Sequence, residues 1–273
     1  MTPSPDQPGL IRAVGARTLG ALGYAGGMAL LLGSTLRWAF RGIFSPRVRF
    51  GGHALAGQMV RVGVRSVGVV ILVQLFIGVI LALQLAPTLE DYGQVDKVAN
   101  IIGTGGFRIL GPIITAVVLS GFAGASIAAE LGSMVVAEEV EALEAIALNP
   151  IRFLVVPRVL ATLVMMVLLS VVADLMIAAG GYLASRVALG PQAYVGYFKH
   201  MQEQLRYRDF TTGLIQAAVF GLLISVIACH EGLRVRGGAE GVGRATTMTV
   251  VYSIVAIVLA ACVFTVIFYV FEI

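Results

Sequence analysis

The segment VGVVILVQLFIGVILALQLAP occupies residues 67–87 and contains no charged side chain. A helix needs about 20 mainly apolar residues to cross the hydrocarbon core of a bilayer, and this segment is long enough. Segments 109–136, 159–185 and 246–271 meet the same criterion, and a fifth, 210–229, is shorter but uncharged. The sequence therefore predicts an all-α integral membrane protein with five transmembrane helices.

The composition of the 273-residue chain agrees with a membrane location. Hydrophobic residues make up 58% and charged residues 12% of the chain, whereas about a quarter of the residues in soluble domains are charged. The net charge is +4, but the basic residues are scattered, so we expect no nucleic-acid partner. Cys229 and Cys262 lie in apolar runs and are expected to act as small hydrophobic residues rather than as disulfide or metal-binding cysteines.

The N-terminal region, residues 1–66, differs from the five-span domain that we assign to residues 67–273. Its stretch 19–36 is rich in glycine and flanked by arginines. This stretch could span the membrane or lie in its interface, and we favour the interfacial helix. With five spans, thirteen Lys and Arg residues fall on the N-terminal side of the membrane and six on the other side. Because basic residues accumulate in the cytoplasm, we predict a multi-pass membrane protein with a cytoplasmic N-terminus and a C-terminus on the outer side.

The connection between the second and third spans is acidic and should face the cytoplasm. Its residues 138–148 are strong helix formers, and Pro150 is predicted to end the helix. Val140, Leu143 and Ile146 or Ala147 recur at helical spacing on one side, with glutamates on the other. The pattern predicts a short amphipathic helix, with an ordinary solvated loop helix as the alternative. The outer connection, 186–209, is rich in aromatic residues and is predicted to lie at the interface.

Small residues recur every four positions in the second span. The two rows are Gly121, Ala125, Ala129 and Ser133, and Gly124, Ala128 and Gly132. Such rows let helix backbones approach closely in lipid, so the span is either a packed structural helix or a moving helix along a transport path.

Two carboxylates lie inside predicted spans, Glu130 in the second and Asp174 in the third. Charged groups at this depth usually face the bundle interior or a cavity. We expect Glu130 to form a structural or gating hydrogen bond, and Asp174 could anchor a neighbouring helix. A proton relay through both residues is the alternative.

The sequence contains no motif for catalysis or for nucleotide binding. Lys97 follows Asp96 and Lys199 follows Phe198, and these are the only lysines, so a phosphate-binding Gly-Lys-Ser/Thr element is excluded. We therefore expect no enzyme activity, metal or cofactor in this chain. If the protein is an ATP-driven transporter, ATP and Mg must be bound by a separate ATPase subunit.

Five groups of residues, in the same order along the chain, resemble the MlaE family of ABC permeases. They are Phe76-Ile77-Gly78 with Leu83-Gln84; Leu110-Gly111-Pro112; Ala123-Gly124 through Ala129-Glu130-Leu131-Gly132; Glu138 and Glu144 with Asn149-Pro150; and Gly241-Val242-Gly243-Arg244-Ala245-Thr246-Thr247 followed by Thr249-Val250-Val251.

The resemblance implies a five-span permease of the bacterial inner membrane, with an N-terminal interfacial helix and a periplasmic C-terminus. It also implies that the permease is paired with a second copy or a related paralogue. It also implies a cytoplasmic ABC ATPase and a periplasmic MCE-domain lipid-binding protein. The implied function is transport of phospholipid or a related lipid between the inner membrane and that carrier, in outer-membrane lipid homeostasis. The segment 138–150 corresponds to the family's coupling helix, with the coupling residues Glu138, Glu139, Glu141, Glu144, Leu148, Asn149 and Pro150.

On this interpretation the first and fifth spans line an outward-facing lipid pocket together with part of the second. The candidate lining residues are Leu75, Phe76, Val79, Leu83, Gln84, Val255 and Leu259. The chain departs from the family pattern at Ile109, Phe122 and Ala261, where familiar members carry Glu, Arg and often Asp. These changes imply a different lipid or one half of a heteromeric pair. A proton-driven secondary transporter using Glu130 and Asp174 remains the alternative function.

Overall fold

The computed structural model describes residues 10–44 and 52–271, and within these ranges the regular elements are all helices. The long helices are α1 (Leu10–Phe44), α3 (Val67–Asp91), α8 (Val156–Ala184), α11 (Tyr207–Leu233) and α12 (Gly238–Val270). The stretch that contains the second predicted span is a continuous run of five helical elements. They are α4 (Val98–Gly105), η3 (Gly106–Leu110), α5 (Gly111–Leu119), η4 (Ser120–Gly124) and α6 (Ala125–Val136). The shorter elements are α2 (Gly52–Val62), η1 (Val64–Ser66), η2 (Val95–Lys97), α7 (Glu139–Ala145), η5 (Ile151–Val155), η6 (Ser185–Leu189), α9 (Pro191–Tyr194) and α10 (Tyr197–Gln204). The prediction of an all-α membrane fold is confirmed.

Six helical stretches of the described residues are long and apolar enough to cross a membrane, by length and composition. They are Thr18–Arg41, Leu55–Asp91, Val95–Val136, Ile151–Leu189, Tyr207–Leu233 and Gly238–Val270. The last five cover the five predicted spans, apart from Phe271 at the end of the last one, and most of them begin well before the predicted starts. The predicted domain boundary, 66/67, falls between the single turn η1 and helix α3.

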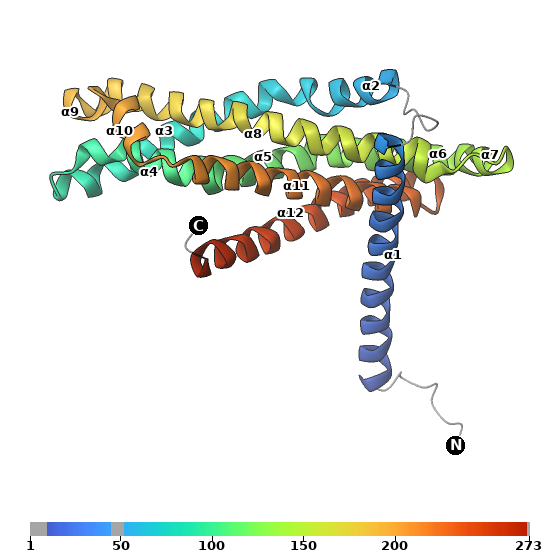
Figure 1. Cartoon of the computed structure of the whole chain (residues 1–273). Coiled ribbons are helices and arrows are strands. Elements are labelled where there is room, and N and C mark those ends of the chain that lie inside the picture. The colour runs from blue at the N-terminus through green and yellow to red at the C-terminus, as the bar shows by residue number, and fades with distance from the viewer. Residues whose placement is uncertain (1–9, 45–51, 272–273) are drawn as a thin grey trace.

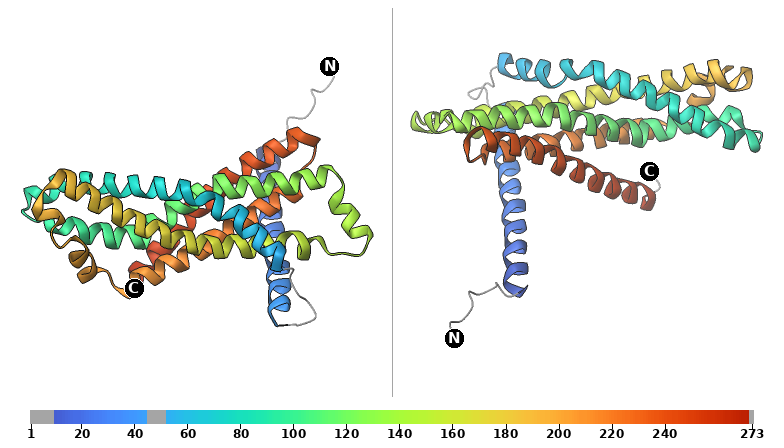
Figure 2. Two further views of the ribbon diagram at one scale, coloured as in Figure 1. Left: turned by 90° about the horizontal axis from the view of Figure 1, so that it is seen from above. Right: turned by 180° about the vertical axis from the view of Figure 1, so that it is seen from behind.

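Helix α1 takes a different direction from the other long helices. It runs crosswise to the bundle, at the end where α6 and α7 lie, and both side views show the same arrangement (Figures 1 and 2). A cation–π contact joins α1 to the bundle at this end, because the guanidinium of Arg152 in η5 lies 5.5 Å from the ring centre of Trp38 in α1. This is the direction that a helix lying in the membrane interface would take if the bundle stands upright in the bilayer.

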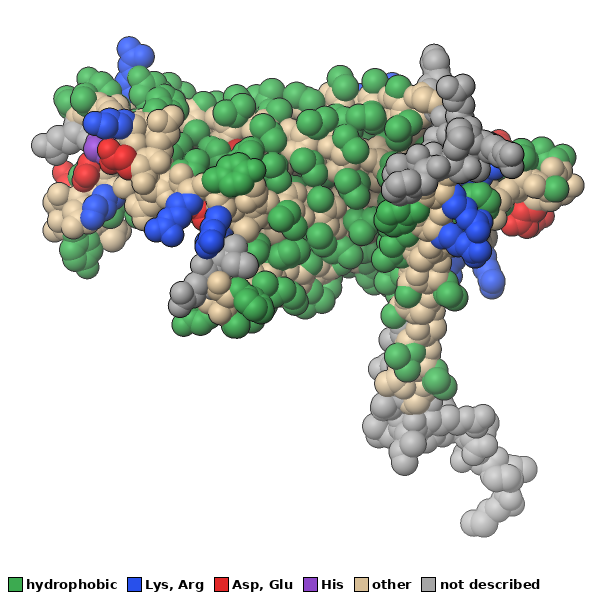
Figure 3. Space-filling model, viewed as in Figure 1, with side chains coloured by type: hydrophobic (Ala, Val, Ile, Leu, Met, Phe, Trp, Pro, Cys, Tyr) green, Lys and Arg blue, Asp and Glu red, His purple; other side chains and the backbone are tan. Residues whose placement is uncertain are grey.

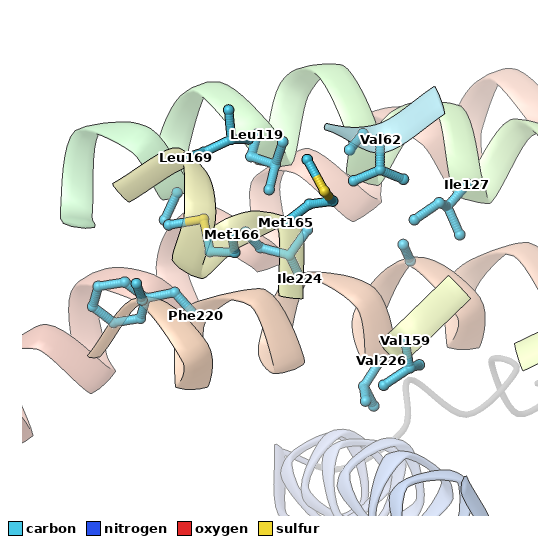
Figure 4. Packing of buried hydrophobic residues seen from close by; sticks show 14 of the residues in the cluster. Val62, Leu119, Ile127, Val159, Met165, Met166, Leu169, Phe220, Ile224 and Val226 are labelled. Atoms are coloured by element: carbon cyan, nitrogen blue, oxygen red, sulfur yellow. The ribbon is translucent and has the colours of Figure 1, made fainter. Parts of the chain in front are cut away.

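The core lies where α2, α5, α6, α8 and α11 meet (Figure 4). Leu119, Ile127, Met166 and Ile224 are among its fully or almost fully buried side chains. Helices α3 and α8 approach closely because a glycine of each helix lies against the backbone of the other. A Cβ atom on Gly78 would collide with the carbonyl oxygen of Ile177, and one on Gly180 with that of Leu75. This close approach is the arrangement expected of small residues in lipid-embedded helices.

Charged side chains gather toward the two ends of the bundle, whereas its middle is covered mainly by apolar groups on the face shown in Figure 3. One end carries α6 and α7, and the opposite end carries α4, α9 and α10 (Figure 1). At the second end the predicted interfacial loop is only partly exposed. Tyr197 is 1% exposed and packs against Tyr182 and Phe198, whereas Tyr207 is 82% exposed.

Candidate functional site

A cavity of about 770 Å³ opens at the end of the bundle where the chain finishes. It lies between η3 and the C-terminal part of α12, which diverges from the other helices (Figures 1 and 2). Its lining residues are Thr104, Gly105, Arg108, Ile109, Thr265, Phe268, Tyr269 and Val270. Most of this wall is apolar. A cavity of this size falls within the usual range for ligand sites.

Arg108 supplies a positive charge to this cavity. It sits in η3, a π-helical turn, and its Nη1 lies 3.4 Å from Oδ1 of Asp209 at the start of α11. Its guanidinium carbon lies 4.9 Å from the ring centre of Phe268. Asp209 also accepts a hydrogen bond from the backbone N–H of Arg206 at 3.0 Å, which fixes the carboxylate. The cavity therefore combines an apolar wall with one positioned guanidinium, and such groups suit phosphate and carboxylate recognition.

From the sequence, Arg108 was counted only among the loop cations that set the membrane orientation, so its place in a candidate binding site was missed. The nearest sequence signal is its neighbour Ile109, noted as a departure from the family pattern, which lines the same cavity. Of the other two departures, Phe122 is partly exposed in η4, and Ala261 is buried in α12.

The residues predicted to line a lipid pocket lie on helices that do not adjoin within one chain. Phe76, Leu83 and Gln84 are exposed on α3, while Leu75 and Val79 are partly buried against α8. Val255 and Leu259 are 52% and 62% exposed on α12. Helices α3 and α12 lie on opposite sides of the bundle (Figure 1). One chain therefore does not bring the two predicted walls together.

The two small-residue rows of the second span face different surroundings. A Cβ atom on Gly124 would lie 3.2 Å from Ile224 of α11, and one on Gly132 would lie 2.8 Å from Val235. Gly121, by contrast, has no atom within 4 Å of a Cβ position and is exposed. The second row thus packs against the bundle, whereas Gly121 faces away from it.

Glu130 pairs with arginines from two other elements. Its Oε1 lies 2.5 Å from Nη1 of Arg61 on α2 and 3.1 Å from Nη2 of Arg158 on α8. Arg158 is buried and also donates from Nη1 to the carbonyl oxygen of Leu154 at 2.7 Å. The ion pair therefore joins α2, α6 and α8 at one point.

Asp174 is buried on α8, directly against Gly111 of α5. A Cβ atom on Gly111 would collide with its Oδ1, which has no hydrogen-bond partner among the described residues. Gln74 of α3 reaches the same turn, donating to the carbonyl oxygen of Gly111 at 3.1 Å and to Thr115 at 2.8 Å. Polar groups of α3, α5 and α8 thus meet inside the bundle.

The predicted coupling helix is shorter than expected. Helix α7 covers Glu139–Ala145, and Glu138 and Ala147 both adopt a left-handed backbone with φ of 59°. The N–H groups of Ala147 and Leu148 donate to the carbonyl oxygens of Glu144 and Leu143, which closes the helix in a Schellman turn. The expected length, 138–148, is wrong because these two turns end the helix at both sides.

The surroundings of α7 also differ from the prediction in two details. Val140 and Leu143 pack against the core, but Ile146 is 67% exposed. Pro150 begins the following helix rather than ending α7, and Oδ1 of Asn149 accepts a hydrogen bond from the N–H of Arg152 at 3.3 Å. Glu138, Glu139, Glu141 and Glu144 are all exposed. A mainly apolar cavity of about 380 Å³ lies beside α7 and is lined by Met134, Glu139, Ala142, Leu143 and Ile146.

This bundle, with long apolar helices, a cavity at one end and a short acidic helix at the other, has the features of the membrane subunit of a transporter. The family model for the MlaE permease matches residues 55–267. The chain therefore belongs to the MlaE permease family, and it is an ABC transporter permease, a multi-pass protein of the inner membrane.

Curated relatives agree with this assignment. A probable ABC transporter permease protein of Rickettsia typhi is 36% identical over 74% of this chain and 78% of its own length. The intermembrane phospholipid transport system permease protein MlaE of Haemophilus influenzae is 32% identical over 77% of this chain and 81% of its own. The chloroplastic protein TRIGALACTOSYLDIACYLGLYCEROL 1 of Arabidopsis thaliana is 33% identical over 74% of this chain and 58% of its own.

Proposed function

We propose that the chain is the permease of an ATP-driven system that moves phospholipid, or a related lipid, between the inner membrane and a periplasmic MCE-domain carrier. The observation that carries this proposal is the cavity beside Arg108, because it pairs apolar walls with one guanidinium. Moving acyl chains from the bilayer to apolar cavity walls costs little free energy. Arginine binds phosphate oxygens through parallel hydrogen bonds. The Haemophilus influenzae relative is named for phospholipid transport, which supports the same substrate class here.

The proposed orientation places the N-terminus in the cytoplasm and the C-terminus in the periplasm. The cavity beside Arg108 then opens toward the periplasm, where an MCE-domain protein would deliver or receive lipid. Helix α7 lies at the opposite, cytoplasmic end (Figure 1). Helix α1 then lies in the cytoplasmic interface.

A second permease copy, or a related paralogue, would complete the predicted lipid pocket. The apolar faces of α3 and α12 that carry Phe76 and Val255 are exposed in one chain. A partner placed over either face would bring a second set of the same residues against it. On this arrangement the cavity beside Arg108 would be continuous with a pocket shared by two chains.

The ATPase would dock on α7 and use it as the coupling helix. Its exposed glutamates and the adjoining cavity offer charged and apolar contacts on the same short element. The turn at Glu138 joins α7 to α6, the turn at Ala147 leads on to η5 and α8, and Val140 and Leu143 of α7 pack against the core, so that a push on α7 would reach the bundle. The partner ATPase would bind ATP and Mg.

The test is ATP-driven lipid transfer by the complex reconstituted in proteoliposomes with its ATPase and MCE-domain protein. Arg108→Gln should lower transfer by about tenfold or more, because a charge-assisted hydrogen bond contributes about 1.5–3 kcal/mol. Arg108→Lys should retain part of the activity, and Arg186→Gln, which removes an exposed arginine at the same end, should have little effect. Undiminished transfer by Arg108→Gln would contradict the site, and transfer without any ATPase would contradict the ATP-driven mechanism.

A proton-coupled transporter is the second candidate, favoured by the buried Oδ1 of Asp174, which has no hydrogen-bond partner among the described residues. The paired state of Glu130 counts against it, because two arginines hold that carboxylate in place. The proteoliposome assay distinguishes the two, since the second candidate requires transfer driven by a proton gradient alone. Loss of that transfer in Asp174→Asn would support it.

A further inference from the structure

A second charged cavity lies at the end of the bundle where α1 crosses. It measures about 340 Å³, is open to the surface, and lies between α1, the end of α11 and the first turns of α12. Tyr24, Met248 and Tyr252 form its less polar side, and Arg234, Arg236, Arg244 and Glu231 form its charged side. Its volume is at the lower end of the usual range for ligand sites, so it could hold a headgroup but not two acyl chains.

Positive charge dominates this cavity. Three arginines line it against one glutamate, and none of the three forms a salt bridge with a carboxylate within the described residues. Arg234 is held in position, because its Nη1 lies 3.0 Å from Nε2 of His230 and its guanidinium lies 6.0 Å from the ring centre of Tyr24. Guanidinium groups gathered without carboxylate partners are suited to binding an anion.

The backbone around the cavity adds to its positive character. Helix α12 begins here at Gly238, and no side chain caps its first N–H groups. The first N–H groups of a helix have no partner within the helix and carry a partial positive charge. Gly241 keeps this turn tight, because a Cβ atom there would collide with the carbonyl oxygen of Arg236. The stretch 241–247, which includes Arg244, belongs to the sequence resemblance, and the lipid cavity at the other end does not use it.

The position of α1 connects this cavity with the membrane surface. Tyr24 stacks edge-on against His230 of α11 at 4.9 Å, and it contacts Tyr252 of α12 at 5.4 Å. If α1 lies in the cytoplasmic interface, the cavity lies at the depth of the lipid headgroups in that leaflet. Phosphate groups are the anions present at this depth.

We propose that this cavity binds the phosphate group of an anionic phospholipid and thereby fastens α1 to the turn between α11 and α12. Arg234, Arg236 and Arg244 would contact the phosphate oxygens, and Tyr24 and Tyr252 would contact the glycerol and upper acyl region. This inference rests on the membrane orientation in the proposed function. The same phosphate chemistry could also come from a soluble anion, so the experiment includes both sources.

The experiment is native mass spectrometry of the detergent-purified full chain titrated with phosphatidylglycerol or with phosphatidylcholine of the same acyl composition. The double variant Arg234→Gln/Arg244→Gln should bind phosphatidylglycerol about tenfold or more weakly, because two charge-assisted contacts are lost. The double variant Arg186→Gln/Arg208→Gln removes the same charge from exposed arginines at the opposite end and should bind like the wild type. Arg234→Lys/Arg244→Lys retains the charge and, if folded normally by gel filtration, should bind with an intermediate affinity.

Three results would overturn the proposal: equal binding by the wild type and the Arg234/Arg244 glutamine variant, equal weakening in the Arg186/Arg208 variant, or equal affinity for the two lipids. Millimolar inorganic phosphate tests the source of the anion. Its failure to displace phosphatidylglycerol supports a lipid ligand, whereas full displacement would overturn the lipid assignment in favour of a soluble phosphate. Lipid transfer by Arg108 variants is measured separately, so failure here leaves the proposed transport function untouched.

Discussion

Replacing Glu130 with glutamine removes the carboxylate that pairs with two arginines inside the bundle. The two arginines differ in exposure, because the side chain of Arg61 is 46% exposed and that of Arg158 is 6% exposed. Glu130→Gln therefore leaves one arginine beside water and the other enclosed without its partner. Arg61→Gln is the matched control, since it removes only the exposed half of the same ion pair.

The expected cost follows from this difference in burial. Breaking a buried pair costs about 3–5 kcal/mol, and we expect the lower end because the carbonyl oxygen of Leu154 still accepts a hydrogen bond from Arg158. Losing an exposed pair costs about 0–1 kcal/mol. In a chain of this size 1 kcal/mol corresponds to about 2–4 °C in melting temperature, so Glu130→Gln should melt about 6–12 °C lower and Arg61→Gln at most about 4 °C lower.

Melting is measured by gel filtration of detergent-solubilised protein after heating, and lipid transfer is measured in parallel below the transition. A structural role for Glu130 predicts that transfer declines only with the folded fraction. A gating role predicts loss of transfer in fully folded protein. The reasoning is refuted if Arg61→Gln destabilises the chain as much as Glu130→Gln, or if neither variant changes the melting temperature.

Three further predictions use other parts of the chain. Gly78→Ala should lower the free energy of unfolding by about 1–3 kcal/mol, and with it the melting temperature, because its Cβ would collide with α8. Gly68→Ala on the same helix has open space and should be neutral or stabilising, and equal melting temperatures of the two variants would contradict the α3–α8 packing. Charge reversal in Glu138→Lys/Glu144→Lys should reduce co-purification of the ATPase without loss of membrane insertion, and an undiminished ATPase would count against the coupling role. A cysteine at Thr18 should react with a membrane-impermeant thiol reagent only after the cells are permeabilised, and labelling of intact cells would show that α1 spans the membrane.

The number and approximate position of the long apolar helices could be predicted, because a bilayer demands a minimum length of apolar chain. The helix ends could not. The connection 88–108, before Ile109, contains Lys97 and four glycines, and its sequence is typical of a loop. In the structure part of it forms helix α4, because Gly103 lets Met201 of α10 pack directly against the backbone. Helix α7 was predicted too long for a related reason. Its ends are set by left-handed backbone at Glu138 and Ala147, a conformation that is unfavourable for both residue types and that their helix propensity does not predict.

The candidate site was likewise predictable only where a local sequence pattern carries it, and not where it depends on contacts between residues far apart in the chain. Hydropathy treats an arginine as the boundary of a span, so Arg108 and Arg158 were both counted as loop charges. Arg158 is instead buried because Glu130 lies beside it, and Arg108 contacts Phe268, which comes from the far end of the chain. One signal was nevertheless present in the sequence. A carboxylate within a span needs a donor or a cation close by, and the arginines next to neighbouring spans were the candidates for Glu130. The same rule does not hold for Asp174: its Oδ1 has no hydrogen-bond partner among the described residues, and Gln74, the nearby donor on α3, donates to Gly111 and Thr115 instead.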